Sequence, residues 1–175
     1  MHGLHSVRDE NSFLKSLKET LLSKFRGQWE RRITASGRYI FYREFKTSWK
    51  VEQYLYDIDK KVFRDAFIRF RLGISELYMH SQRYITGADE ILCPLCREEF
   101  ETEIHFLLTC PALNDLRDYY IFKFMDGRNS NPVNWILASE QKHVVRSVSV
   151  FLYKAFMRRR EAIDSPEKST CYTEC

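Results

Sequence analysis

Three cysteines and one histidine lie close together in this chain at spacings that metal-binding proteins use. The segment 93–110 reads CPLCREEFETEIHFLLTC, so Cys93, Cys96, His105 and Cys110 follow the pattern C-x2-C-x8-H-x4-C. Four cysteine and histidine ligands are typical of structural zinc, which binds thiolate sulfur and imidazole nitrogen in a tetrahedron. We therefore predict a CCHC zinc site, with Zn2+ as the cofactor and these four residues as its ligands.

The second ligand pair, His105 and Cys110, requires a break in the helix. Two residues five apart on a continuous α-helix project about 140° away from each other. Pro111 follows Cys110 directly, and the residue before a proline is pushed out of the helical conformation. We expect the Cys110 thiol to turn back toward His105 at that break. In the alternative interpretation the four are unrelated core residues, because cysteine is often buried as a small apolar side chain.

The composition favours helices as the elements that position these ligands. The chain has 175 residues, of which 44% are hydrophobic and 30% charged, with only 6 glycines and 4 prolines. This length suits one domain with a core of its own, and few breakers favour helices over turn-rich strands. We predict a mainly α, helical single domain with a small CCHC zinc-knuckle hairpin.

Apolar residues at steps of three and four predict the helices. Longer helices are expected at 12–34, 60–72, 112–124 and 140–160, and shorter ones at 51–56 and 101–109. In the first helix the apolar face is expected to comprise Leu14, Leu17, Leu21, Phe25, Trp29 and Ile33. In the last helix it is expected to comprise Val144, Val148, Phe151, Leu152 and Ala155. Gly27 could kink the first helix, and 126–132 is expected to be a loop.

Five regions follow from this pattern. We expect a flexible N-terminus at 1–10, N-terminal helices with an aromatic and basic segment at 11–57, a helix plus the CCHC region at 58–126, C-terminal helices at 132–162 and a disordered tail at 163–175. The last region is polar, which argues against a packed structure there.

Basic side chains form the second candidate site. The net charge of +4 permits a nucleic-acid partner without requiring one. The candidates for binding phosphate are Lys60, Lys61, Arg64, Arg71, Arg43, Lys46, Arg158, Arg159 and Arg160. The aromatic residues Tyr39, Phe41, Tyr42 and Trp49 could stack on bases. In the alternative interpretation the cations form a solvated face or complement a helix end, and the aromatic residues belong to the core.

The cysteine and histidine segment resembles a known family. The runs Cys93-Pro94-x-Cys96, Glu101-Thr102-Glu103-x-His105-Phe106-Leu107 and Cys110-Pro111 are similar to the zinc-binding segment that follows the reverse transcriptase of LINE-type (non-LTR) retrotransposons. Blocks at 38–46, 61–77 and 83–84, and the helix ending FLYKAFMRRR, also look like the flanks of that segment. The resemblance covers roughly residues 12–160 and implies a retrotransposon-derived, reverse transcriptase-associated module that holds RNA or DNA.

The resemblance does not extend to a catalytic site, and we expect no enzymatic activity and no small-molecule substrate. The aspartate pair of a polymerase is absent. Asp164, Glu167 and Lys168 resemble a nuclease cluster only superficially, because they lie in a polar tail. A RING-type ubiquitin ligase, where CPLC also occurs, binds two zinc ions with eight ligands, and this chain offers four in register.

The location is expected to be intracellular. The first ten residues are polar and do not resemble a signal peptide. No run approaches the about 20 apolar residues that span a bilayer, so a membrane partner is not expected. In the nucleus or cytoplasm thiols remain reduced and available as metal ligands.

Two functions remain open from the sequence. In the first, the module binds RNA or DNA without catalysis. In the second, it is a zinc-stapled structural or protein-interaction domain, a retroelement remnant that could dock on a reverse transcriptase core.

Overall fold

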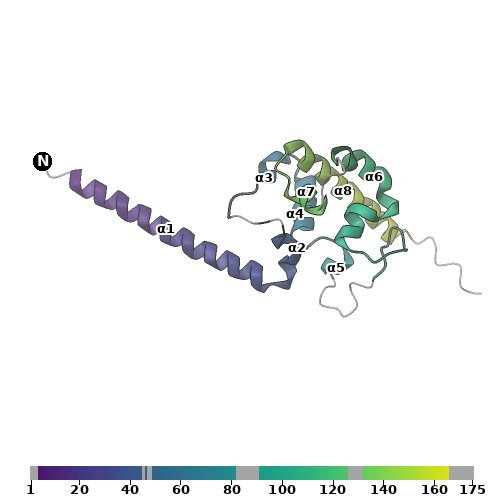
Figure 1. The fold of residues 1–175 in the computed structure, drawn as a ribbon, viewed down its shortest axis with the longest axis horizontal. Helices are drawn as coiled ribbons and strands as arrows, with labels where there is room; N and C mark the ends of the chain where they lie inside the picture. Colours follow the sequence, from purple (N-terminus) through teal and green to yellow (C-terminus); the bar gives the residue numbers. More distant parts are fainter. Residues whose placement is uncertain (1–3, 45, 47–48, 82–90, 126–131, 166–175) are drawn as a thin grey trace, which may run out of the picture.

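Helices make up nearly all the regular structure of the described residues. The computed structural model describes residues 4–44, 46, 49–81, 91–125 and 132–165 (Figure 1). Along the chain the α-helices are α1 (Leu4–Ala35), α2 (Ile40–Arg43), α3 (Tyr54–Asp57), α4 (Lys61–Arg71), α5 (Tyr78–Ser81), α6 (Asn114–Tyr120), α7 (Pro132–Ala138) and α8 (Lys142–Asp164). The described ranges contain no strand, and one isolated antiparallel bridge joins Leu92 and Phe100. The predicted mainly α fold is confirmed.

Short turns of other helix types complete the fold. The 3-10 turns are η1 (Gly37–Tyr39), η4 (Pro111–Leu113) and η5 (Phe122–Phe124). One turn of π-helix, η3 (His105–Thr109), lies between the hairpin of the cysteine pair and α6. None of the described helices combines the length and the apolar character needed to cross a membrane.

The long helix α8 forms the centre of the bundle, and α3, α4, α6 and α7 pack around it. Its predicted inner face is confirmed, because Val144, Val148, Phe151, Leu152 and Ala155 are all buried. These positions recur at steps of three and four, which places them on one side of the helix. The repeat of apolar residues in α8 therefore provides the surface on which the shorter helices assemble.

Three phenylalanines join the cysteine and histidine segment to this core. Phe70 comes from α4, Phe106 from η3 and Phe156 from α8. The rings of Phe106 and Phe156 stack with centroids 4.9 Å apart, and Phe70 lies 6.2 Å from Phe106 and 6.4 Å from Phe156. Because Phe106 directly follows His105, packing of this ring fixes the position of the adjacent histidine.

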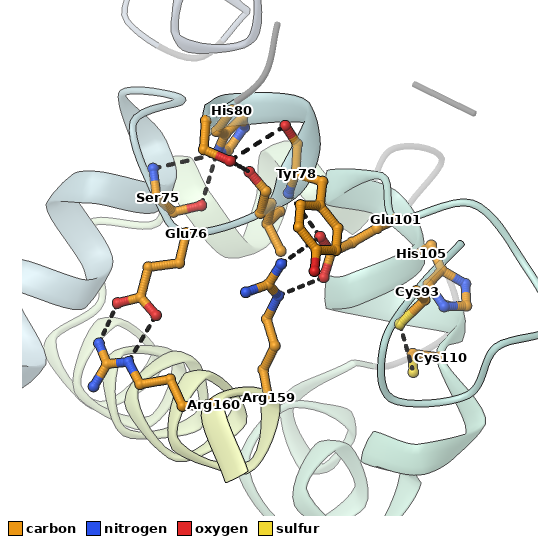
Figure 2. Close-up of polar contacts among 12 residues, drawn as sticks. Ser75, Glu76, Tyr78, His80, Cys93, Glu101, His105, Cys110, Arg159 and Arg160 are labelled. Atoms are coloured by element: carbon orange, nitrogen blue, oxygen red, sulfur yellow. Dashed lines mark hydrogen bonds and ion pairs between the residues drawn. The ribbon is translucent and has the colours of Figure 1, made fainter. Parts of the chain in front are cut away.

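A buried ion pair makes a second connection to the same segment. Arg159 of α8 donates two hydrogen bonds to the carboxylate of Glu101, at 2.5 and 2.8 Å, and its guanidinium lies 4.7 Å from the centre of the Tyr78 ring (Figure 2). The backbone N–H of Tyr78 donates to the same carboxylate at 2.7 Å. This single carboxylate therefore connects the hairpin, α5 and α8.

The first helix differs most from the prediction. It begins at Leu4, so residues 4–10 are helical, and Gly27 does not interrupt it. Ile33 is buried and Trp29 packs against the core, whereas the face from Leu14 to Phe25 is exposed. The rest of the described structure therefore covers only the C-terminal end of the predicted apolar face. The reason is visible in Figure 1, where α1 projects away from the other helices and contacts them only at its C-terminal end.

Smaller differences concern the C-terminal third. Pro132 was expected to end a loop but begins α7, since proline fits the first turn of a helix. The rest of that loop, 126–131, lies outside the described residues. Helix α8 continues to Asp164, so the first two residues of the predicted tail are helical. Helix α4 agrees with its predicted range to within one residue at each end.

The buried ion pair yields a stability prediction. Arg159→Ala leaves Glu101 buried without its cation, so the free energy of unfolding should fall by about 3 to 5 kcal/mol. Its neighbour Arg160 pairs with Glu76 at the surface, and Arg160→Ala should lower the free energy of unfolding by at most about 1 kcal/mol. Urea denaturation followed by circular dichroism measures both. Equal losses in the two variants would contradict the structural role assigned to Arg159.

Candidate metal centre

The four predicted ligands come together in the folded chain. The sulfurs of Cys93, Cys96 and Cys110 and one ring nitrogen of His105 all lie within 4.8 Å of one another. Cys93 Sγ is 3.9 Å from Cys110 Sγ, and Cys96 Sγ is 3.3 Å from His105 Nε2. Cys93, Cys110 and His105 are buried and Cys96 is partly exposed, so one side of the cluster faces solvent.

A tight hairpin positions the cysteine pair. The backbone N–H of Cys93 donates to the carbonyl of Glu99 at 2.8 Å, and that of Arg97 donates to the carbonyl of Cys93 at 2.8 Å. Arg97 has a φ of 61°, the left-handed conformation that closes such a turn. The bridge between Leu92 and Phe100 then pairs the two arms. The turn directs both cysteine side chains to the same side of the hairpin.

The π-turn η3 positions the other pair. The N–H of Cys110 donates to the carbonyl of His105 at 2.8 Å, which is the i to i+5 bond of a π-helix. This wider turn brings residues five apart to one side, as a continuous α-helix would not. Cys110 itself has ψ of 116°, outside the helical region, as expected for the residue before Pro111. The predicted break is confirmed, and the π-turn adds a feature that the sequence did not indicate.

A set of hydrogen bonds holds the His105 ring with Nε2 toward the sulfurs. The Nδ1 atom lies 2.8 Å from a carboxylate oxygen of Glu99 and 3.2 Å from the hydroxyl of Thr109. A carboxylate on the far nitrogen places the proton on Nδ1 and leaves the lone pair of Nε2 for a metal. Glu99 therefore acts as a positioning residue for His105.

Arg117 fixes the backbone around Cys110 from the other side. It is fully buried and donates to the carbonyl of Leu107 at 3.0 Å, to that of Cys110 at 2.9 Å and to Asn114 Oδ1 at 2.6 Å. These bonds satisfy carbonyl groups that the end of η3 leaves unpaired. Burial lowers the pKa of the Arg117 guanidinium, but an arginine remains charged at neutral pH.

The two buried thiols share a proton unequally. The Cys93 and Cys110 sulfurs lie 3.9 Å apart and either can donate a hydrogen bond to the other; this contact lowers the pKa of Cys93 to about 5 and raises the pKa of Cys110 above its usual range. The pair therefore loses its first proton more readily than an isolated cysteine would, and the thiolate is the form of cysteine that binds metals.

The donor geometry fits a tetrahedral metal ion. With metal–sulfur bonds of about 2.3 Å and a metal–nitrogen bond of about 2.0 Å, adjacent donors in a tetrahedron lie about 3.5 to 3.8 Å apart. The observed separations of 3.9 and 3.3 Å are close to these values. The four residues could therefore bind one metal ion without rearrangement of the fold.

Two more residues near the site were not foreseen from the sequence. The Nδ1 atom of His80 lies 2.6 Å from the Ser75 hydroxyl (Figure 2). Its Nε2 atom lies 2.7 Å from a carboxylate oxygen of Glu103. Ser75 and His80 are buried, so these contacts connect α5 to the residues just before His105. No local pattern predicts such a network, because its members are distant in the sequence.

The basic candidates are mostly engaged within the protein. Carboxylates pair with Lys46, Lys61, Arg71, Arg158, Arg159 and Arg160. Backbone carbonyls accept from Arg43 and Arg64. Arg71 and Arg159 are buried, so in this conformation neither guanidinium is open to a phosphate from solvent. Of the nine candidates, Lys60 alone has no carboxylate or carbonyl partner in the described structure; its ammonium lies 5.5 Å from the centre of the Phe63 ring.

The aromatic candidates are also engaged in packing. Tyr42 is buried and Tyr39 packs against the core. Trp49 is exposed, with its ring centroid 5.2 Å from that of Trp29. The side chain of Phe41 lies outside the described part of the structure. Of the three described side chains, Trp49 is the most exposed and so offers the best surface for a base to stack on.

The hydrogen bond to His105 yields a prediction about metal affinity. Glu99→Ala removes the acceptor on Nδ1 and should weaken metal binding by about 10- to 100-fold. Glu98→Ala is the control, because Glu98 is an exposed neighbour without a partner in the described structure. Competition with a chromogenic chelator measures both affinities. Equal affinities would show that Glu99 does not position the histidine.

Comparison of the chain with protein-family models, with curated proteins and with solved structures gives no match. The site is therefore interpreted from its own residues and geometry.

Proposed function

We propose that this chain is a non-catalytic, zinc-binding helical module in which the metal acts as a folding staple. The proposal depends on one observation, the convergence of Cys93, Cys96, His105 and Cys110 within 4.8 Å. Three sulfurs and one imidazole form a ligand set that binds zinc in preference to magnesium, calcium or manganese. Four protein ligands leave no position for a reactive water, so the proposed role is structural.

The resemblance to the zinc-binding segment of LINE-type retrotransposons supports this proposal. Several residues that carry the resemblance have structural tasks around the site. Glu101 pairs with Arg159, Phe106 packs in the core and Pro111 ends the π-turn. We infer that the module derives from a LINE-type retrotransposon, because the motif that resembles this family includes both the proposed ligands and the residues that position them.

Metal removal provides the first test of the proposal. Because the site hardly exists in an unfolded chain, binding free energy becomes folding free energy. The purified protein should contain one zinc per chain, and a chelator should lower its melting temperature. Cys93→Ser and His105→Ala should behave like the metal-free protein, with faster amide hydrogen exchange at 91–125. A zinc-free protein with unchanged melting would mean that the four residues are simply part of the core.

Binding to RNA or DNA is the second candidate function. It is supported by the family resemblance, by the net charge of +4 and by exposed lysines without carboxylate partners in the described structure, among them Lys15, Lys18, Lys24 and Lys60. Most other candidate cations are paired within the protein, which favours the protein-interaction alternative over nucleic-acid binding. A reverse transcriptase core remains a proposed partner for either function.

Salt dependence tests this second candidate. If lysines contact phosphates, affinity for single-stranded RNA should fall as salt rises, with a logarithmic slope of about −0.7 for each contact. Lys60→Ala should make the slope shallower by roughly that amount. Lys61→Ala provides the control, because Lys61 is already paired with Asp65. Affinity that stays constant between 50 and 300 mM salt (about a sixfold range) would favour the protein-interaction alternative.

A further inference from the structure

Helix α1 exposes an apolar surface that the described structure leaves uncovered. Six side chains between residues 13 and 25 are between 44% and 66% exposed, namely Phe13, Leu14, Leu17, Leu21, Leu22 and Phe25. Single exposed apolar residues are ordinary, whereas a contiguous set is typical of an interaction site. The set lies on the part of α1 that projects beyond the bundle (Figure 1).

Four of these residues form a narrow seam. At about 100° per residue, Leu14, Leu17, Leu21 and Phe25 fall within a sector of about 80°. The seam extends over three turns of helix, or about 18 Å. An apolar stripe of this width is that of a contact between two helices, and it is narrower than the face of a helix that lies on a core.

Lysines border the seam on both sides. On the helical wheel Lys24 lies beside Leu17 and Lys18 lies beside Phe25. Both lysines are exposed, and neither has a carboxylate partner in the described part of the chain. Glu19, the one acid between residues 13 and 25, projects from the opposite side of the helix. The seam therefore has a positively charged border, unlike the bundle, where most candidate cations are paired.

The base of α1 is anchored to the bundle. Ile33 is buried, the rings of Trp29 and Trp49 are 5.2 Å apart at the centroids, and Arg43 donates to the carbonyl of Thr34 at 3.1 Å. The helix is thus formed and oriented before any partner binds. A preformed binding surface lowers the ordering cost of association.

We propose that the seam of α1 binds an amphipathic helix of a partner protein, one that carries acidic residues beside its own apolar stripe. Leucine and phenylalanine side chains would pack between the two helices, and Lys18 and Lys24 would pair with the acidic residues of the partner. This interaction does not depend on the metal centre, because the seam lies on another element.

The charges argue against the other occupants of the seam. Two copies of α1 paired along it would bring lysine against lysine in either orientation, which opposes self-association. Helices that lie on lipid present a broad apolar face. On the helical wheel of α1, Lys18 falls between Phe25 and Leu22, and Lys24 falls between Leu17 and Phe13, so charged side chains interrupt such a face. An acidic helix satisfies both the apolar and the charged side chains.

Two synthetic helical peptides test the proposal on the metal-loaded full chain. Both carry leucine at seam positions, and they differ only in having glutamate or lysine beside it. The glutamate peptide should bind, and Leu17→Ser combined with Leu21→Ser should weaken binding by at least about tenfold. Ser16→Ala with Ser23→Ala, on the opposite side of α1, is the matched control and should bind as the unchanged protein does.

A charge exchange keeps the test valid even if the leucine variants disturb the helix. Lys18→Glu combined with Lys24→Glu should reverse the preference, so that the lysine peptide binds better than the glutamate peptide. Equal binding of the two peptides, or binding of neither, would overturn the proposal. So would dimerisation through the seam in sedimentation, or binding to phosphatidylserine vesicles in place of the peptide. Zinc content is measured in parallel, so that failure of the metal site is recognised separately.

Discussion

The carboxylate of Glu101 lies where three parts of the molecule meet. Arg159 of α8 and the backbone N–H of Tyr78 both donate to it, and it stands at the exit of the hairpin that carries Cys93 and Cys96. Taking a carboxylate and a guanidinium out of water costs several kcal/mol per ion unless both are fully hydrogen-bonded. The hairpin, α5 and α8 therefore have to be in register for this charge to be neutralised. Packing of Phe106 against Phe70 of α4 and Phe156 of α8 likewise requires η3 and these two helices to be in register.

Positive charge in the bundle mainly stabilises the bundle itself. Arg117 satisfies the carbonyls at the end of η3, Arg159 neutralises Glu101, and Arg158 pairs with Asp115 in two hydrogen bonds of 2.6 and 2.7 Å. A net charge of +4 therefore says little about which face would attract a polyanion. Unpaired lysines and exposed leucines coincide on α1, which is the reason for treating that helix as the interaction element.

The sequence predicted the parts of the fold that depend on local patterns. The inner face of α8 and the range of α4 follow from apolar residues at helical spacing, and the metal ligands follow from a short motif. Periodicity shows that α1 has an apolar stripe, but it does not show whether anything covers that stripe. The π-turn and the buried contacts of Arg117 could not be predicted from the sequence, because both depend on where backbone carbonyl groups point in the folded chain. Helix α7 lies within the predicted C-terminal helices at 132–162, but its start could not be placed, because Pro132 fits a loop and the first turn of a helix equally well.

The π-turn also restricts how the length of this chain can vary in evolution. His105 has to face the sulfurs while the next residue, Phe106, fills the core, and Arg117 has to reach the carbonyls of Leu107 and Cys110. Adding or deleting one residue between them would rotate one set of contacts by about 100° relative to the other. Related sequences should therefore keep the stretch from His105 to Arg117 at constant length.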